Sequence, residues 1–379
     1  MTSVAFHVDQ LFYPAPGGIG TYIRRLVPAL AGQDPSLEIK LFHARFDDAG
    51  QQAQMPERWM REFWMEELPH RIQTLYPRWA ITGRPHLPRA LSSLDLVHAP
   101  SPAAIPSAGS GQRLVVTVHD LAFLTTPSVF PPAWRFQFRL GLRATLRRAD
   151  AIITPSRNTA EDLLSRTNVD PAKVHVIPLA ARTDVTAADP EQILSRLKIP
   201  RPYLLFVGTL EPRKNLVRLV RAYRRAATSG LPHALVLAGP VGWKHQTLLR
   251  EIALRGPGEV VLTGDLTDEE IDAVYREAAA FVYPALYEGF GLPVLEAMAR
   301  GVPTIAANTS SLPEVAGDAA LQVDPDSVRE IAAAIETLLT DPALAERLSM
   351  RGRARAERFS WEETARLTLQ VYEKAIASR

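Results

Sequence analysis

Short runs of β-branched and other apolar residues recur along this sequence, and each is followed by a longer segment with helical spacing. This alternation is typical of βαβ units, in which a helix connects two parallel strands. The strand runs are apolar almost throughout, as expected for strands that helices cover on both faces. The pattern therefore predicts an α/β fold built on doubly wound parallel sheets.

The predicted strands form two series. The first series is Val4–Val8, Leu37–Phe42, Asp95–His98, Leu114–His119, Ala151–Thr154 and Val174–Ile177, and the second is Tyr203–Val207, Ala234–Ala238, Val260–Thr263, Ala280–Tyr283, Thr304–Ala306 and Ala320–Val323. The stretch 178–200 between them has little strand character and is interpreted as a linker with a short helix. The segment 51–89 is too mixed to assign. At 379 residues the chain has the length of two domains, which we place at 1–182 and 183–360.

Composition excludes several classes of function. The chain has no cysteine, which rules out disulfides, thiolate metal sites and a cysteine nucleophile, and favours a cytoplasmic location. A net charge of +2 gives no argument for a nucleic-acid partner. The sequence contains no run of about 18 apolar residues and begins without the pattern of a signal peptide, so we expect any membrane contact to be peripheral.

Two features of the first half follow predicted strands, where ligands of parallel sheets bind. The turn Pro14–Gly20 contains Gly17 and Gly18 and precedes a predicted helix, so its bare amides suit a phosphate, although a tight turn is the simpler alternative. It lacks the G-x-G-x-x-G spacing of a dinucleotide site, which argues against a nicotinamide enzyme. His119 ends another strand, where it could bind a hydroxyl, carry a proton or be structural.

The first strand of the second series ends in a turn with two adjacent cations. Gly208 leads into Glu-Pro-Arg-Lys-Asn, in which Arg213 and Lys214 precede a predicted helix. Fixed cations can stabilise the charge of a leaving diphosphate in place of Mg²⁺, so we expect no metal. The alternative is a solvated basic turn. That alternative is unfavourable because cations at a helix N-terminus oppose the helix dipole unless an anion joins them.

The most specific motif runs from Tyr283 to Glu296. Glu288 lies in the loop after a predicted strand, and Glu296 lies one turn into a helix that Pro293 can open. Gly289 and Gly291 between them allow the backbone to approach a ligand closely. One carboxylate can accept hydrogen bonds from sugar hydroxyls and the other from ribose hydroxyls. The alternative is a capped helix with an exposed glutamate.

These motifs together resemble the retaining GT-B glycosyltransferases, specifically glycosyltransferase family 4, over nearly the whole chain. The family's Glu-x7-Glu motif corresponds to Glu288 and Glu296, its Arg-Lys pair to Arg213 and Lys214, and its glycine loop to Gly17 and Gly18. The resemblance implies two Rossmann-like domains facing across a cleft. It also implies a C-terminal helix, residues 361–379, that crosses back to pack on the N-terminal domain. The N-terminal domain would bind the acceptor and the C-terminal domain the nucleotide sugar.

The resemblance also implies roles for single residues. Arg213 and Lys214 would neutralise the diphosphate, Glu288 would hold the donor sugar, Glu296 would hold the ribose, and His119 would line the sugar pocket. The residues implied in catalysis are His119, Glu288, Arg213 and Lys214, and those implied in donor binding are Gly17, Gly18, Gly208, Arg213, Lys214, Glu288, Gly289, Phe290, Gly291, Leu292 and Glu296.

The implied reaction is transfer of a hexose, with mannose as the first candidate, from a GDP- or UDP-linked donor. It would retain the anomeric configuration and need no metal or other cofactor, with the leaving phosphate accepting the proton. The acceptor would be a glycan, a lipid-linked molecule or a small molecule. Rival interpretations are a GT-B epimerase or phosphorylase, a catalytically silent sugar-nucleotide binder, or a subunit of a glycosylation complex.

A basic amphipathic segment in the first half could indicate how the acceptor binds and whether the protein contacts a membrane. Between Trp134 and Arg148, arginines recur at four-residue spacing from Arg135 to Arg147 and form one slowly drifting stripe of a helix. Such a helix could lie on the inner face of an anionic membrane, present a solvated face or dock a charged acceptor.

Overall fold

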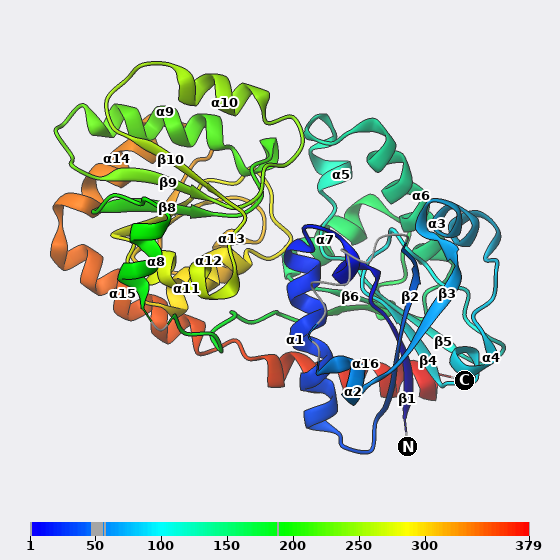
Figure 1. The fold of residues 1–379 in the computed structure, drawn as a ribbon. Helices are drawn as coiled ribbons and strands as arrows, with labels where there is room; N and C mark the ends of the chain where they lie inside the picture. The colour runs from blue at the N-terminus through cyan, green and yellow to red at the C-terminus, as the bar shows by residue number, and fades with distance from the viewer. Residues whose placement is uncertain (1, 47–55, 57, 188, 379) are drawn as a thin grey trace. The chain divides into compact units, whose positions relative to one another are not determined.

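The computed structural model describes residues 2–46, 56, 58–187 and 189–378 (Figure 1). The chain divides into two compact units, residues 1–179 with 360–379 and residues 180–359. The division falls at 179/180, slightly before the boundary expected at residue 182. Each unit has a parallel sheet with helices on its two faces, so the predicted α/β class and the two Rossmann-like domains are confirmed.

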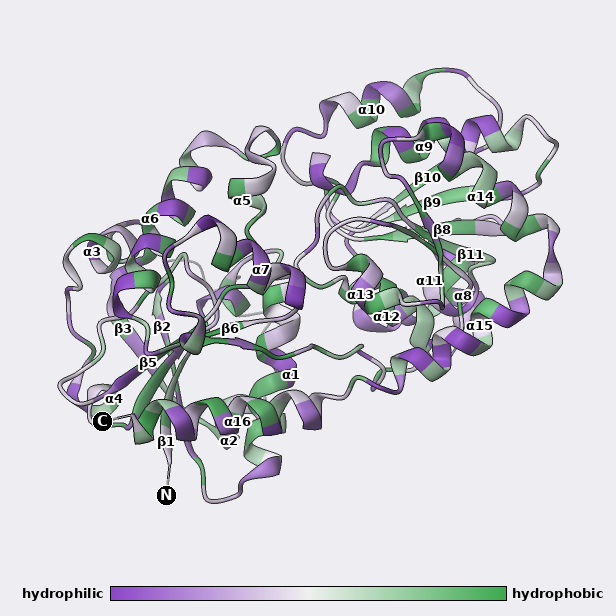
Figure 2. Ribbon diagram, turned by 180° about the vertical axis from the view of Figure 1, so that it is seen from behind, coloured by the Kyte–Doolittle hydropathy of each residue, from purple (hydrophilic) through white to green (hydrophobic). Residues whose placement is uncertain are grey.

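The sheet of unit 1 has the order β3-β2-β1-β4-β5-β6-β7, and all its neighbouring strands are parallel. Its strands are β1 (Ser3–His7), β2 (Glu38–Arg45), β3 (Trp64–Arg71), β4 (Leu96–Ala99), β5 (Arg113–Thr117), β6 (Ala151–Thr154) and β7 (Val174–Val176). Four strands, β1 and β4 to β6, are almost completely buried, which explains their nearly continuous apolar sequences. Figure 2 shows green stretches in strands of the sheet, while the helices around them carry both green and purple.

The helices of unit 1 include one from the end of the chain. They are α1 (Gly17–Gln33), α2 (Trp59–Glu62), α3 (Ile72–Thr82), α4 (Arg89–Ser92), α5 (Ala122–Thr125), α6 (Pro132–Arg148), α7 (Arg157–Arg166) and α16 (Trp361–Ala377), with short 3₁₀ turns at Asp9–Phe12, Pro127–Val129 and Pro171–Lys173. Helix α16 packs against α1 and β5. The first unit is therefore completed by residues that follow the second unit in sequence.

A buried histidine connects α16 to the sheet. Nδ1 of His98, in β4, lies 2.6 Å from the hydroxyl of Tyr372, and Nε2 lies 2.8 Å from Oγ1 of Thr117. The hydroxyl of Tyr22, in α1, lies 2.9 Å from the same Thr117 oxygen. Burial, and secondarily the charge of His119, lower the pKa of His98 to about 3. The ring is therefore neutral at pH 7, with one nitrogen donating and the other accepting.

The sheet of unit 2 has the order β10-β9-β8-β11-β12-β13 and is also parallel. Its strands are β8 (Tyr203–Val207), β9 (Ala234–Ala238), β10 (Val260–Gly264), β11 (Ala280–Tyr283), β12 (Thr304–Ala307) and β13 (Leu321–Val323). Its helices are α8 (Pro190–Arg196), α9 (Leu216–Ala227), α10 (Gln246–Ala253), α11 (Asp268–Arg276), α12 (Leu292–Ala299), α13 (Leu312–Ala316), α14 (Val328–Thr340) and α15 (Pro342–Ala356), with a 3₁₀ turn, η5, at Pro212–Lys214.

Local sequence sets where several of these helices begin. Thr267 and Glu270 form a capping box at α11, in which each side chain bonds the backbone of the other. Ser327 and Ser360 cap α14 and α16 through the amide three residues ahead. These helices therefore start where the sequence supplies an acceptor for their unpaired amides.

Three expectations about the elements need correction. Strand β3 was not expected, and its sequence Trp-Met-Glu-Glu-Leu-Pro-His-Arg is half-exposed because β3 pairs only with β2 at the sheet edge. Helix α1 begins at Gly17, so the two glycines form its first turn rather than a loop before it. The stretch 178–200 contains the expected short helix. It is not a linker throughout, because Arg182 forms ion pairs with Asp268 and Glu296 of unit 2.

Among the described residues, no helix combines the length and the apolar character that crossing a membrane requires.

Candidate donor site in unit 2

The candidate site lies where the strand order of unit 2 reverses direction. Strands β8, β9 and β10 extend to one side of the sheet and β11, β12 and β13 to the other, so β8 and β11 are neighbours (Figure 2). Arg213 and Lys214 follow β8, and Glu288 follows β11. The crevice beyond the carboxyl ends of two such strands is the usual ligand site of an open parallel sheet.

Lys214 and Glu288 form the centre of a buried polar cluster. Nζ of Lys214 contacts Oε1 of Glu288 and lies 2.6 Å from the hydroxyl of Tyr283, which in turn donates to Oε1 at 3.1 Å. Nη1 of Arg213 donates to the same Oε1 at 2.9 Å, and its Nη2 lies 2.7 Å from Oε1 of Glu211. The anion that two cations at a helix start require is thus supplied by the chain's own carboxylates.

The hydrogen bonds within the cluster do not use every donor and acceptor of Lys214 and Glu288. Among the described residues, all three donors to the Glu288 carboxylate reach Oε1 and none reaches Oε2. The ammonium of Lys214 has three N–H groups, of which Glu288 and Tyr283 occupy two. One carboxylate oxygen and one ammonium hydrogen can therefore bond a substrate without breaking the cluster.

Burial and charge shift the ionisation of this cluster in opposite directions. Burial alone would raise the pKa of Glu288, but Arg213 and Lys214 outweigh it and hold that pKa below its ordinary value. Burial raises the pKa of Glu211 despite the same two cations. Burial, followed by the charge of Arg213, lowers the pKa of Lys214. Glu288 is therefore the carboxylate of the cluster that is held in its charged form.

Polar bonds fix the loop that carries Glu288. Oγ of Ser311 donates to the carbonyls of Glu288 and Phe290 at 2.9 and 2.8 Å, and the amide of Glu288 donates to Oγ of Ser310 at 2.9 Å. Gly291 has a φ of +107° at the start of α12, a conformation that favours glycine. The side chain of Phe290 packs edge-on against Phe359, with ring centroids 5.8 Å apart. Phe290 can therefore offer a ligand its main chain rather than its ring.

The turn after β8 is held in a similar way. Gly208 has a φ of +146°, and its position lies beside Lys214, whose Cε would be 3.9 Å from an added Cβ. The amide of Leu286 donates to the carbonyl of Arg213 at 2.9 Å, which joins the two loops. The side chain of Asn215 donates to the carbonyls of Pro284 and Pro325. The cations thus lie on a braced turn rather than a free loop.

Glu296, the second carboxylate of the motif, has different partners. Its Oε1 lies 3.2 Å from Nε of Arg182, and its Oε2 accepts from the hydroxyl of Tyr275 at 3.3 Å. Helix α12 starts at Leu292, one residue before Pro293, and buries Glu296 one turn later. A ribose hydroxyl that bonds Glu296, as the sequence predicted, would therefore share this carboxylate with Arg182 and Tyr275.

The predicted residues of unit 1 also lie close to one another. Gly17 and Gly18 are exposed at the start of α1, and Gly17 has a φ of +59°. Tyr22, in the next turn, packs edge-on against His119 with ring centroids 4.8 Å apart. Nε2 of His119 is buried and has no hydrogen-bond partner among the described residues. Burial lowers the pKa of His119 to about 4, so at neutral pH it would meet a substrate as a neutral imidazole.

An Asp-x-Asp sequence bears on the expectation that no metal is used. Asp324 and Asp326 directly follow β13, and carboxylates are the usual oxygen ligands of Mg²⁺. Oδ1 of Asp326 forms an ion pair with Arg218 at 2.9 Å, and Oδ1 of Asp324 accepts from the amide of Asp326. The sequence prediction overlooked this pair. It follows the edge strand of the sheet and adjoins the turn that carries the cations, because the side chain of Asn215 donates to the carbonyl of Pro325, between the two aspartates.

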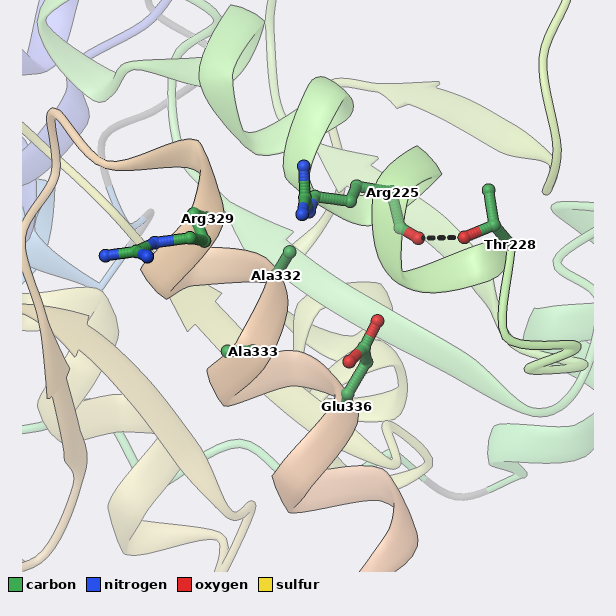
Figure 3. A pocket seen from close by; sticks show the side chains of 6 residues that line it. All are labelled: Arg225, Thr228, Arg329, Ala332, Ala333 and Glu336. Atoms are coloured by element: carbon green, nitrogen blue, oxygen red, sulfur yellow. Dashed lines mark hydrogen bonds between the residues drawn. The ribbon is translucent and has the colours of Figure 1, made fainter.

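A hollow of about 380 Å³ lies elsewhere in unit 2, between α9 and α14. Figure 3 shows its lining by Arg225, Thr228, Arg329, Ala332, Ala333 and Glu336. Helix α9 starts next to Lys214 and has 12 residues, so its far end is about 18 Å from the cluster at 1.5 Å per residue. The hollow is therefore separate from the candidate site.

Comparison with known proteins identifies the family. Residues 16–185 match the family described as Glycosyltransferase Family 4, and residues 191–355 match Glycosyl transferases group 1. The O-antigen chain mannosyltransferase B of Escherichia coli is 31% identical over 97% of this chain and 99% of its own length. The chain belongs to glycosyltransferase family 4. It is a glycosyltransferase, as the Glu-x7-Glu and Arg-Lys motifs predicted.

Two further relatives of this chain are also named as mannosyltransferases. The serotype-specific mannosyltransferase WbdA of Escherichia coli is 32% identical over 73% of this chain but only 35% of its own length. The MMP alpha-(1->4)-mannosyltransferase of Mycolicibacterium hassiacum is 34% identical over 61% of this chain and 56% of its own.

Solved structures confirm the GT-B fold of this glycosyltransferase. The sucrose-phosphate synthase of Thermosynechococcus elongatus aligns with a TM-score of 0.72 at 22% identity and full coverage of both chains. HepE of Anabaena, in complex with UDP-glucose, aligns with a TM-score of 0.72 at 17% identity and full coverage. WaaG, a glycosyltransferase involved in lipopolysaccharide biosynthesis, aligns with a TM-score of 0.71 over 98% of both chains at 16% identity.

Sequence reasoning missed several residues of this glycosyltransferase's candidate site. Glu211 directly precedes the Pro-Arg-Lys turn, and Tyr283 ends the strand before the Glu288 loop, so their positions at strand ends could have suggested them. Ser310, Ser311 and Arg182 carry no comparable signal. Their contribution depends on tertiary contacts with residues far away in sequence.

Proposed function

We propose that this enzyme transfers a hexose from a GDP- or UDP-linked donor, with mannose as the first candidate, and retains the anomeric configuration without a metal. The observation that carries the proposal is the cluster of Arg213, Lys214, Tyr283 and Glu288 at the point where the strand order reverses. The mannosyltransferase names of the relatives favour mannose, and the UDP-glucose complex of HepE favours a nucleotide-sugar donor.

Each residue of the cluster has a chemical task in this proposal. The remaining N–H of Lys214 and the guanidinium of Arg213 would bond the diphosphate oxygens, where negative charge develops as the sugar leaves. Oε2 of Glu288 would accept from a sugar hydroxyl. Main-chain amides of residues 289–292, at the start of α12, would meet the phosphate, and Glu296 would bond the ribose. In the same proposal, Gly17, Gly18 and His119 of unit 1 would contact the substrate.

The state of Glu288 supports a same-face reaction. Two cations and a phenol hold its carboxylate in the charged form and reduce its basicity, so it is poorly suited to attack carbon or accept a proton. In the proposed step the bond from the anomeric carbon to the phosphate oxygen breaks, and its electron pair stays on the phosphate. The acceptor oxygen bonds the same face of that carbon, and its proton passes to the departing phosphate oxygen.

The acceptor in this proposal is a glycan, a lipid-linked molecule or a small molecule, bound by unit 1. Polysaccharide biosynthesis fits the O-antigen mannosyltransferases among the relatives. We also propose a cytoplasmic location. With a lipid-linked acceptor, the enzyme would act at the inner face of the membrane.

The donor can be tested with a panel of sugar nucleotides. We expect GDP-mannose or a UDP-hexose to raise the unfolding midpoint, because a ligand at about a hundredfold excess over its Kd stabilises the folded state by about 2.7 kcal/mol. The same donor should be hydrolysed slowly without acceptor, and NMR of the transfer product should show the donor's anomeric configuration. An inverted product would contradict retention, and binding without any turnover of a donor would contradict transfer from that donor.

Chelation tests the leaving-group chemistry. With EDTA present throughout, we expect the transfer rate to stay within about twofold of its untreated value, because Arg213 and Lys214 supply the charge a metal would otherwise supply. The matched control is an Asp326→Asn variant, which removes one carboxylate of the Asp-x-Asp pair and should also keep its rate. Activity that EDTA abolishes and Mn²⁺ or Mg²⁺ restores would show that the cations do not replace a metal.

A further inference from the structure

The charged side chains of the candidate donor site balance one another before a ligand binds. Arg213 and Lys214 carry positive charge, and the carboxylates of Glu211 and Glu288 lie against them. Two cations therefore face two anions, and the net charge of the cluster is zero. A nucleoside diphosphate would bring further negative charge into this buried place, where unbalanced charge is costly. Binding is favoured if one of the two carboxylates becomes neutral.

Glu211 is the carboxylate of the cluster with the weaker hydrogen-bond support. Its Oε1 lies 2.7 Å from Nη2 of Arg213, and its side chain forms no cap bond to the turn η5 that follows it. Glu288 accepts instead from Arg213, Lys214 and the hydroxyl of Tyr283. Both carboxylates are buried, and Glu211 is only 4% exposed. Neutralising Glu211 therefore costs less than neutralising Glu288, because fewer charge-assisted bonds are weakened.

Burial and charge act on these two carboxylates with opposite results. Burial raises the pKa of Glu211, the cations Arg213 and Lys214 offset this only in part, and the negative charge of Glu288 raises it further. The same cations hold the pKa of Glu288 below its ordinary value. A bound anion would raise both pKa values. Glu211 starts closer to protonation and is therefore the carboxylate that reaches it first.

The loop after β9 also packs against Glu211. A Cβ added to Gly242 would lie 3.3 Å from the Cβ of Glu211. The titratable residues of this loop, 239–245, are Lys244 and His245, and Nδ1 of His245 lies 2.7 Å from the carbonyl oxygen of Gly242. The sequence of the loop contains no carboxylate, so the negative charge that acts on Glu211 comes from Glu288 and from a bound ligand.

We propose that Glu211 takes up a proton from solvent when the diphosphate of the donor binds, and returns it when the nucleotide leaves. The inference rests on the proposed function, which places the diphosphate at Arg213 and Lys214. The proton adds to a carboxylate oxygen and no other bond forms or breaks. The neutral carboxyl group can still accept from Arg213 through its carbonyl oxygen. Two cations then face one carboxylate, so the cluster has a net positive charge for the diphosphate.

Calorimetry of GDP and UDP binding to the full chain measures this proton. Titrations at about pH 7.5 in buffers of different ionisation enthalpy give the number of protons taken up. The native chain should take up about half a proton or more beyond a Glu211→Gln variant, whose amide keeps an acceptor for Arg213 but does not titrate. Protons lost by the nucleotide's own phosphate are the same for both proteins and cancel in the difference.

The pH dependence of nucleotide affinity should show the same proton. As the pH rises from about 6.5 to 8.5, the bound state must acquire a proton that the free protein lacks, so the Kd of the native chain should rise by up to about tenfold per pH unit more steeply than that of Glu211→Gln. At the upper end of this range Glu211→Gln should bind the nucleotide more tightly than the native chain, because its cluster is positively charged at every pH.

A matched control and a second measurement complete the test. Glu251 is another buried carboxylate of unit 2 that pairs with an arginine, Arg221, so Glu251→Gln should take up protons as the native chain does. Infrared difference spectra of the native chain should gain the carbonyl band of a protonated carboxyl group on nucleotide binding, which tests the proposal even if Glu211→Gln does not fold.

Two kinds of failure can be told apart. Nucleotide binding with equal proton uptake by the native chain and folded Glu211→Gln, or without the new infrared band, would overturn the role of Glu211 and leave the proposed donor site standing. It would mean that the main-chain amides at the start of α12 balance the ligand instead. If neither GDP nor UDP binds the native chain, the proposed donor is wrong and this inference is overturned with it.

Discussion

Replacing Lys214 with methionine is expected to lower the kcat of sugar transfer by about a hundredfold or more, because one fixed charge on the developing diphosphate is lost. Methionine keeps much of the buried stem of Lys214 while removing its charge. Binding of the nucleoside diphosphate should weaken as well. Calorimetry of nucleotide binding and a transfer assay measure the two effects, and Lys374→Met, at an exposed lysine of α16, is the matched control.

Glu288→Gln should give a different combination of effects from Lys214→Met. Its kcat should fall by a similar factor, since the contact with the donor sugar is lost. Nucleoside diphosphate binding should be unchanged or tighter, because Arg213 and Lys214 lose the carboxylate that neutralises them. A loss of nucleotide affinity in both variants would indicate a purely structural role for the pair. Near-native turnover in either folded variant would remove this cluster from the catalytic site.

The stability of unit 1 is expected to fall as the pH is lowered from about 6.5. His98 is fully buried, and its pKa is lowered to about 3, whereas in the unfolded chain it is about 6.5. Between these values the unfolded state binds a proton that the folded state does not. Acid therefore favours unfolding by about 1.4 kcal/mol per pH unit for this one group. His119, with a pKa of about 4, changes stability in the same direction.

Urea unfolding followed by tryptophan fluorescence at several pH values measures this slope. Trp59 and Trp79 are completely buried in unit 1 and report on it. A His98→Gln variant should lose about 1.4 kcal/mol per pH unit of the dependence between about pH 4.5 and 6. Tyr372→Phe, which removes a hydrogen bond but keeps the histidine, should lower stability by about 1 to 3 kcal/mol while keeping the slope. An unchanged slope in His98→Gln would show that this ring is not the group that resists protonation.

The strands were predictable where burial on both faces leaves a continuous apolar run. Tyr203–Val207, Ala234–Ala238 and Ala151–Thr154 have the predicted bounds because both faces of these strands are covered. Strand β3 could not be predicted in the same way. It lies at a sheet edge, where a half-exposed strand of mixed residues is stabilised by pairing with β2 rather than by its own pattern.

The principal residues of the candidate site were predictable for a topological reason. Cations after one strand and a carboxylate after another come together when the two strands are neighbours at the reversal of strand order. Spacing did not predict that Glu288 neutralises Lys214, or that Arg182 and Tyr275 bind Glu296. Such partnerships depend on which distant segments meet in the folded unit, and a single sequence does not encode that as a local pattern.

The position of α16 has a consequence for the order in which the chain is completed during synthesis. Unit 2, residues 180–359, emerges from the ribosome in full before Tyr372 does, so its sheet can close while unit 1 still lacks its last helix. Until then the ring of His98 faces the vacant side of β4 without its phenol partner. The part of the chain that is made first is therefore the part that finishes last, and a nascent chain stopped before residue 361 would leave uncovered the faces of α1 and β5 against which α16 packs.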